Sequence, residues 1–162
     1  MIKSFKKLLE LRQDVVLIIA GTTFDESTKY ENRLKRMAAT ISSERIIFTG
    51  RYSKIGEIIK NFDVFVYLSK SENLGGVFES LLFEVPTVSS NRGALPELVV
   101  NNETGYTVNI EDIEDIVEKI NYMIIGYGYE MTKTGKNKVL KTCNKEDILN
   151  RSYNIYKEII NK

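Results

Sequence analysis

Residues 63–90 read DVFVYLSKSENLGGVFESLLFEVPTVSS and contain a complete strand–helix–strand pattern. The apolar run at residues 64–68 predicts a buried strand, because strands of parallel sheets are apolar on both faces. Gly75 and Gly76 then form a turn, and apolar residues with a helical period predict a helix over residues 76–84. A proline stops this helix, and residues 87–90 predict the next strand.

Strands and helices alternate in the same way along the rest of the chain. Further strands are predicted at residues 15–20, 46–50 and 105–108. Amphipathic helices are predicted around residues 5–9, 34–41, 55–59, 113–124 and 148–159, with one more between the last two. This order is typical of βαβ units, so we predict an α/β fold: a single Rossmann-like domain over residues 1–162. Its sheet is expected to be mostly parallel, with helices on both faces. The tyrosines near the C-terminus are interpreted as helix-packing residues: Tyr127, Tyr129, Tyr153 and Tyr156.

Composition excludes several classes of function. The chain has 23 Lys and Arg against 22 Asp and Glu, and this net charge of +1 argues against nucleic acid binding through bulk charge. It has no histidine, so His-based catalysis and His-ligated metals are excluded within these residues. Cys143 is the single cysteine, which excludes an intrachain disulfide. Since neither a signal-peptide pattern nor an apolar run of about 18 residues occurs, we expect a reducing, cytoplasmic setting.

The turn and helix after residue 68 carry the clearest local chemistry. Ligands of parallel sheets bind beyond the carboxyl ends of the strands, and Gly75 and Gly76 permit a ligand to approach the backbone there. The helix that follows offers free amides and a positive dipole end to an anion. Glu79 lies one turn inside, where it can accept hydrogen bonds from hydroxyls attached to that anion. The pattern predicts a nucleotide or nucleotide sugar, and a tight turn followed by a solvated glutamate is the alternative.

A series of short motifs runs in order along nearly the whole chain. The motifs are Leu17-Ile-Ile-Ala-Gly21, Ile47-Phe-Thr-Gly50, Asp63-Val-Phe-Val66, Glu79, Pro86-Thr-Val88, Gly93-Ala-Leu-Pro-Glu97 and Thr104-Gly-Tyr-Thr-Val108. In this order they resemble the C-terminal, donor-binding lobe of the retaining GT-B glycosyltransferases of family 4. The resemblance implies that residues 1–162 form a single Rossmann-like, nucleotide-sugar-binding domain, which is one lobe of a GT-B fold. It also implies transfer of a sugar from a nucleoside-diphosphate sugar to a hydroxyl acceptor, with retention of the anomeric configuration.

The family's paired acids have candidate counterparts in this sequence. The second acid of the family motif binds the donor ribose, and Glu79 holds that place. The first acid reaches toward the transferred sugar, and Glu72 is the candidate catalytic residue. Six residues separate Glu72 from Glu79, one fewer than is usual in the family, and a polar turn residue is the alternative role for Glu72.

The resemblance further implies two groups of donor-binding residues. Backbone amides of the glycine-containing turn bind the donor phosphates and sugar, and here that turn comprises Asn73, Leu74, Gly75 and Gly76. The loop after the Phe-x-Gly strand holds the base, and here it comprises Gly50, Arg51 and Tyr52.

One part of the family's lobe has no counterpart in these residues. Members begin with a strand, followed by an Arg and a Lys that clamp the donor diphosphate. That strand is central in the usual strand order, so its absence predicts a gap with unpaired backbone groups. Another segment or chain could fill the gap, the sheet could close up, or these residues could be an excerpt of a longer protein. Lys70 and Arg92 could replace part of the positive charge, with a solvated surface role as the alternative.

The sequence therefore predicts the donor-binding lobe of a retaining glycosyltransferase that needs neither a metal nor another cofactor. Its expected partners are a nucleotide-sugar donor, a hydroxyl acceptor, and an N-terminal lobe or partner chain; no nucleic acid is expected. A non-catalytic nucleotide- or glycan-binding module is the alternative. Five lysines between residues 133 and 145 predict a solvated helix face, with peripheral contact to the inner face of a membrane as the alternative.

Overall fold

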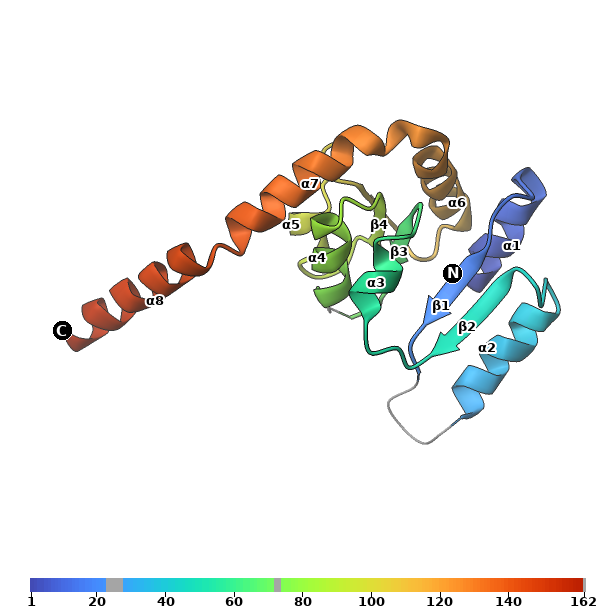
Figure 1. Cartoon of the computed structure of the whole chain (residues 1–162), viewed down its shortest axis with the longest axis horizontal. Helices are drawn as coiled ribbons and strands as arrows, with labels where there is room; N and C mark the ends of the chain where they lie inside the picture. Colours follow the sequence, from blue (N-terminus) through green and yellow to red (C-terminus); the bar gives the residue numbers. More distant parts are fainter. Residues whose placement is uncertain (23–27, 72–73, 162) are drawn as a thin grey trace.

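The computed structural model describes residues 1–22, 28–71 and 74–161, which form an α/β domain (Figure 1). Its strands are β1 (Leu17–Ala20), β2 (Ile46–Gly50), β3 (Phe65–Tyr67), β4 (Thr87–Ser90) and β5 (Tyr106–Val108). Its helices are α1 (Ile2–Leu11), α2 (Lys29–Ala39), α3 (Ile55–Ile59), α4 (Gly75–Leu82), α5 (Leu95–Leu98), α6 (Ile113–Tyr122), the π-helical segment η1 (Met123–Tyr127), α7 (Tyr129–Thr142) and α8 (Lys145–Ile160). This order confirms the predicted alternation of strands and helices.

The strands form two parallel sheets. β1 pairs with β2, and β3, β4 and β5 pair in that order, with every pair parallel. The predicted parallel pairing is therefore confirmed. The break falls between β1 and β3, where the gap was expected, and the sheet has not closed up across it.

A shared hydrophobic core holds the two sheets together. Ile2, Phe5 and Leu8 of α1 are buried in one cluster with residues of both sheets, including Ile46 of β2 and Val88 of β4. Helix α1 contacts both α2 and α6, so it lies across the break on one face of the sheets. On the other side, α4, α5 and α7 form a second buried cluster that covers β3 and β4.

All five strands run in the same direction, as the contacts of α1 show. Lys7 of α1 pairs with Glu114 near the start of α6, and Arg12 after α1 donates to Asn121 near the end of α6. Helices α1 and α6 are therefore parallel to each other. The chain reverses direction between α1 and β1, and again between β5 and α6, through short connections. Because α1 and α6 are parallel, β1 and β5 are parallel as well. The carboxyl ends of both sheets thus face the same edge of the domain.

Two helices differ from the sequence prediction, α4 in its bounds and α5 in its presence. The helix predicted over residues 76–84 spans Gly75–Leu82. Helix α5 was not predicted; it is a single turn that begins with a proline at its first positions and buries Leu95 and Leu98. A four-residue helix has no periodicity to detect, because its apolar residues are one turn apart only once.

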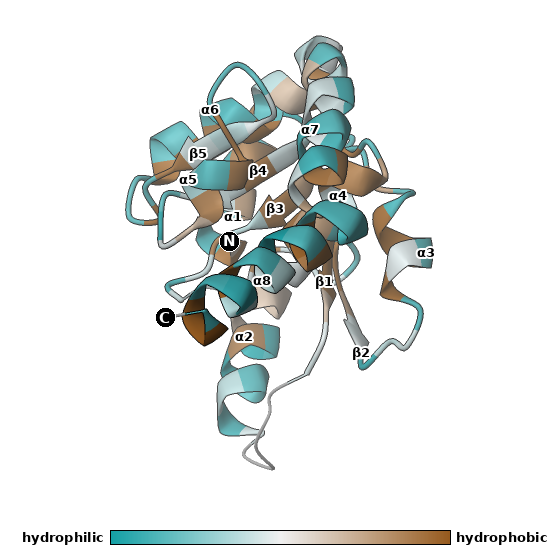
Figure 2. Ribbon diagram, turned by 90° about the vertical axis from the view of Figure 1, so that its left-hand side faces the viewer, coloured by the Kyte–Doolittle hydropathy of each residue, from teal (hydrophilic) through white to brown (hydrophobic). Residues whose placement is uncertain are grey.

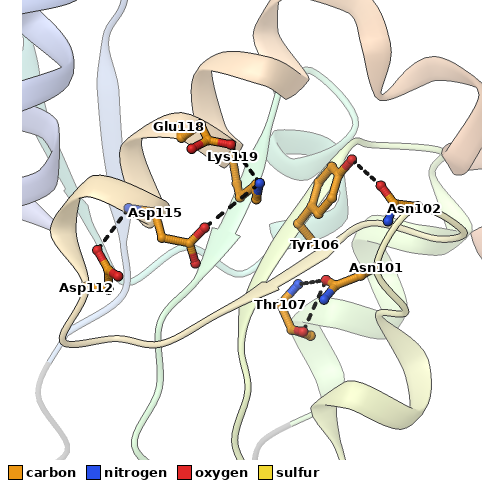
Figure 3. Close-up of polar contacts among 8 residues, drawn as sticks. All are labelled: Asn101, Asn102, Tyr106, Thr107, Asp112, Asp115, Glu118 and Lys119. Carbon is orange, nitrogen blue, oxygen red and sulfur yellow. Dashed lines mark hydrogen bonds and ion pairs between the residues drawn. The ribbon is translucent and has the colours of Figure 1, made fainter.

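Short polar contacts fix the turn into β5 and the start of α6 (Figure 3). The side-chain oxygen of Asn101 accepts hydrogen bonds from the amide and hydroxyl of Thr107. The Tyr106 hydroxyl donates to Asn102, a residue with a positive φ of 63°. Asp112 caps α6 by accepting a hydrogen bond from the amide of Asp115 at 3.0 Å. These residues stabilise the outer edge of the three-stranded sheet.

Helix α8 extends away from the rest of the domain (Figure 1) and buries no residue. Hydrophobic and hydrophilic residues alternate along it (Figure 2). The expectation that the C-terminal tyrosines pack is wrong for Tyr129, Tyr153 and Tyr156, whose rings are exposed. Tyr127 does stack on Tyr122, with ring centroids 4.6 Å apart, yet it also remains exposed. Across the described ranges, no helix has both the length and the apolar content needed to span a membrane.

Candidate functional site

Hydrogen bonds join the loops at the carboxyl edge within each sheet. The amide of Gly21 donates to the Gly50 carbonyl at 3.0 Å, which ties the end of β1 to the end of β2. The Ser90 hydroxyl donates to the Ser69 carbonyl at 2.8 Å, which ties the end of β4 to the loop after β3. These loops are the ones in which the sequence places the candidate donor site.

Helix α4 begins at this edge. Leu74 is its N-cap, and the first helical hydrogen bond runs from the Phe78 amide to the Leu74 carbonyl at 2.8 Å. The Gly76 amide precedes that bond, so it has no acceptor within the helix. No acidic residue occurs in the first turn of α4, so no carboxylate of that turn competes with an anion for the free amides. This arrangement suits a phosphate group.

Packing gives a second reason for the glycine at position 76. A Cβ atom placed there would lie 3.1 Å from the ring of Phe65 in β3. Gly76 therefore lets α4 approach β3 closely, which brings the start of the helix to the end of the strand. Gly76 therefore places the anion site at the end of β3 and also leaves it accessible to a ligand.

Glu79 lies one turn inside α4 and is half-buried. Its side chain makes no hydrogen bond or ion pair with any residue in the described part of the chain, so packing alone does not account for a carboxylate there. Glu72 and Asn73, the candidate catalytic residue and the first turn residue, lie outside the described residues. The structure therefore brings together Leu74, Gly75, Gly76 and Glu79, on one helix end.

The candidate base-binding loop follows β2. Gly50 has a φ of +67°, a backbone conformation that favours glycine, and it turns the chain away from the strand. Arg51 and Tyr52 come next and are exposed, with 46% of the Tyr52 surface accessible. Their side chains are available to a ligand. Lys70 and Arg92, the candidate substitutes for the missing cations, are exposed as well.

Sequence reasoning missed the contribution of Ser69 and Ser90. Their contact holds the loop after β3 against the end of β4, and the Ser71 amide in turn donates to the Ser69 hydroxyl at 3.1 Å. Serines after a strand are common in turns, so the sequence offered no signal for this pairing. The contact orients the segment that leads into α4.

A shallow hollow lies apart from these loops, at the surface of α2. It measures about 600 Å³ and is lined by Asn32, Lys35, Arg36 and Ala39. None of the predicted site residues lines it. The candidate donor site is instead an open edge formed by loops and one helix end.

Solved structures with the same architecture are GT-B glycosyltransferases. A glycosyltransferase from Rickettsia africae superposes with a TM-score of 0.86 at 22% identity, over 98% of this chain and 43% of its own. Anabaena HepE, solved in complex with UDP-glucose, superposes with a TM-score of 0.79 at 16% identity, over 86% of this chain and 39% of its own. At these identities the likeness shows the fold, which is that of one GT-B lobe.

Residues 1–139 match the family described as glycosyl transferases group 1, and the chain belongs to that family. The lipopolysaccharide core biosynthesis mannosyltransferase LpsB of Rhizobium meliloti is 31% identical over 121 residues, which are 72% of this chain and 34% of LpsB. The capsular polysaccharide biosynthesis glycosyltransferase CapM of Staphylococcus aureus is 28% identical over 125 residues, which are 76% of this chain and 32% of CapM. The chain thus spans about a third of the length of these relatives.

Proposed function

We propose that residues 1–162 form the donor-binding lobe of a retaining, family-4-like glycosyltransferase. The lobe would bind a nucleoside-diphosphate sugar, whose sugar is transferred to a hydroxyl acceptor. One observation carries the proposal: α4 begins at the carboxyl edge of β3 with the Gly76 amide available and Glu79 one turn inside. HepE was solved with UDP-glucose and with UDP, so uridine nucleotides are the first donors to test.

The proposed chemistry is electrostatic. The amides at the start of α4 and the positive end of its dipole would bind the diphosphate and stabilise the charge that develops when it leaves. Glu79 would accept hydrogen bonds from the ribose hydroxyls and so fix the position of the nucleotide. Arg51 and Tyr52 would contact the base from the loop after β2. Glu72 remains our candidate for the group that faces the transferred sugar.

Transfer would need a second lobe, because the acceptor must approach the donor from the opposite side. The curated relatives that match this chain are about three times as long as the part that it matches. We propose that the acceptor-binding lobe belongs to the same longer polypeptide or to a partner chain. Cys143 is exposed, which suits a reducing, cytoplasmic setting. The exposed Lys133, Lys141 and Lys145 would face anionic headgroups if the acceptor were carried by a lipid at the inner face of a membrane.

Calorimetric titration with UDP and UDP-glucose tests the donor-binding role. We expect measurable but weak binding, with the same affinity in the presence of EDTA because the proposed site uses no metal. An absence of both heat and thermal shift at millimolar nucleotide would contradict the proposal. Loss of binding in EDTA would contradict only its metal independence. Binding without sugar transfer, in a mixture that contains the second lobe and acceptor, would favour the non-catalytic module instead.

A further inference from the structure

Three tyrosine rings lie in contact from the core to the surface at the end of α6. Tyr106 of β5 is buried, and its ring meets that of Tyr122 edge to face, with centroids 5.6 Å apart. The Tyr122 ring stacks in turn on that of Tyr127 in η1, at 4.6 Å and an interplanar angle of 19°. Tyr127 is nevertheless 59% exposed. Tyr106, Tyr122 and Tyr127 thus form a tyrosine ladder whose last ring turns its outer face to solvent.

The backbone of η1 makes this stack possible. In an α-helix, residues five apart point about 140° away from each other around the axis, so their rings do not meet. The wider turn of a π-helix brings them to the same side, and η1 begins directly after Tyr122. Gly126 has a φ of 100° and turns the chain just before Tyr127. Both π-helical turns and unusual backbone conformations are frequent at functional sites.

The glycine at position 126 is required by this turn and not by close packing. A Cβ atom placed on Gly126 would have nothing within 4 Å, so space is not the reason for the glycine. The residues on either side hold the turn in place. Met123 is buried in the core, and a Cβ atom on Gly128 would lie 2.6 Å from the sulfur of Met123 and 3.0 Å from Pro86. The packed core therefore fixes a conformation whose visible result is the outward-facing ring of Tyr127.

Polar groups of α6 and of the turn before β5 border the tyrosine ladder (Figure 3). The Lys119 ammonium lies 5.2 Å from the centroid of the Tyr106 ring, and it pairs with Glu118 at 2.8 Å and with Asp115 at 4.0 Å. Asn102 accepts a hydrogen bond from the Tyr106 hydroxyl, and its amide nitrogen is a donor. Since two carboxylates face one ammonium, these groups have no surplus positive charge for a phosphate. Their oxygens can accept hydrogen bonds from hydroxyls.

We propose that the outer face of Tyr127 is a binding platform for a neutral oligosaccharide. A pyranose ring has an apolar face of C–H groups and a rim of hydroxyls, so it matches an aromatic ring bordered by hydrogen-bonding groups. A nucleobase could also stack there, but its phosphates would be repelled by the carboxylates of Asp115 and Glu118. Tyr106 begins β5, so the platform lies at the edge opposite the donor loops, which follow the strand ends. It would bind a glycan chain and not the donor sugar, and this inference does not rest on the proposed function.

An NMR titration of residues 1–162 with maltohexaose and with mannohexaose, in the absence of nucleotide, tests the platform. We expect at least one of these saccharides to shift the aromatic signals of Tyr127, with a Kd of about 1 mM. Tyr127→Phe keeps the flat ring and should bind as the wild type does. Tyr127→Leu keeps an apolar side chain without a flat face, and it should weaken binding by about tenfold.

Two further variants separate the platform from general effects of exposed side chains. Tyr156→Leu removes a ring that is 65% exposed on α8 and stacks on no residue in the described part of the chain, so it should leave the affinity unchanged. Gly126→Ala keeps the Tyr127 ring but disfavours the φ of 100° that positions it. It should therefore weaken binding about as much as Tyr127→Leu does, at a melting temperature that shows a folded protein.

Three results would overturn the proposal. One is the absence of any shift of the Tyr127 signals with either saccharide at about 10 mM, ten times the expected Kd. Another is equal saccharide affinity for Tyr127→Leu and the wild type. The third is a concentration-dependent dimer that Tyr127→Leu abolishes, which would assign the platform to a second copy of the chain. UDP titration of the same samples reports on the donor site separately, so failure of one proposal is distinguishable from failure of the other.

Discussion

Glu79 is the residue on which the donor assignment depends most. It is half-buried, it lies one turn from Gly75 and Gly76, and its side chain has no hydrogen-bond or ion-pair partner among the described residues. If it holds a ribose diol, each hydrogen bond is charge-assisted and contributes about 1.5–3 kcal/mol. We therefore expect Glu79→Gln to weaken UDP binding about tenfold or more, as measured by calorimetry.

The control for this variant must be a glutamate away from the carboxyl edge. Glu84 follows α4 closely but is unsuitable, because it has a positive φ of 56° and pairs with Lys136 of α7 at 2.5 Å. Glu158 is exposed on α8, so Glu158→Gln should leave both affinity and melting temperature unchanged. Equal UDP affinity for Glu79→Gln and the wild type, at matched melting temperatures, would refute the ribose-binding role.

Asp14 provides a test of the electrostatics that is independent of the site. Both of its carboxylate oxygens accept hydrogen bonds from the Arg12 guanidinium, at 2.7 and 2.5 Å. This contact lowers the pKa of Asp14 to about 2. A lowered pKa means that the ion pair stabilises the fold above the ordinary aspartate value, and that this contribution is lost as the pH falls through about 2.

We expect Arg12→Gln to raise the pKa of Asp14 toward the ordinary value of about 3.9, because the side-chain hydrogen bonds from Arg12 are the largest cause of its shift. An NMR titration of the Asp14 carboxyl carbon measures it in both proteins. The same midpoint in the variant and the wild type would show that Arg12 does not hold this carboxylate in solution.

At the scale of elements, the close pairing of β4 and β5 depends on Gly105. A Cβ atom at this position would lie 2.4 Å from the Thr87 carbonyl oxygen and 2.8 Å from a methyl of Val99. Because the nearer atom belongs to the backbone, a side chain there forces the strands apart. We expect Gly105→Ala to lower the free energy of unfolding by about 1–3 kcal/mol in urea denaturation.

The neighbouring exposed position supplies the control for that substitution. Glu103→Ala should change the free energy of unfolding by no more than about 0.5 kcal/mol, because no packed side chain is lost. If Gly105→Ala were as stable as Glu103→Ala, the approach of β5 to the backbone of β4 would be looser in solution than described.

The sequence allows the elements to be predicted where its pattern is local. The strand at residues 87–90 is confirmed as β4, and the helix after Gly75 begins within one residue of its predicted start. The grouping of Gly76 with Glu79 follows from that helix alone, so it could be predicted too. The turn α5 and the segment η1 could not, because a single turn has no period and the π-helical segment contains Gly126 at a φ of 100°.

At the scale of the whole molecule, α7 and α8 contribute very differently to stability. Val139 of α7 is buried with Val77 and Leu81 of α4, whereas α8 buries no residue. We expect removal of residues 144–162 to change the free energy of unfolding by less than about 0.5 kcal/mol. Val139→Ala should lower it by about 1–3 kcal/mol, through lost burial and the cavity left behind. Urea denaturation compares the two, and a large loss on removing α8 would mean that it packs on the domain in solution.

A last prediction concerns catalysis by the chain alone. The candidate site is an open edge of loops around the start of α4, so a donor bound there would keep one side in water. Electrostatic stabilisation of a leaving diphosphate is strongest in a site from which water is excluded. We therefore expect residues 1–162 to bind UDP with a Kd of about 1 mM, which corresponds to roughly −4.1 kcal/mol, and to transfer no sugar at an appreciable rate. The assay follows product formation from UDP-glucose and a hydroxyl acceptor by chromatography, beside a full-length glycosyltransferase as the positive control.

Slow hydrolysis of the donor is compatible with this expectation, because water reaches the open side. Robust transfer by a strictly monomeric sample would contradict this expectation, since it would mean that one lobe binds the acceptor and completes the active site by itself.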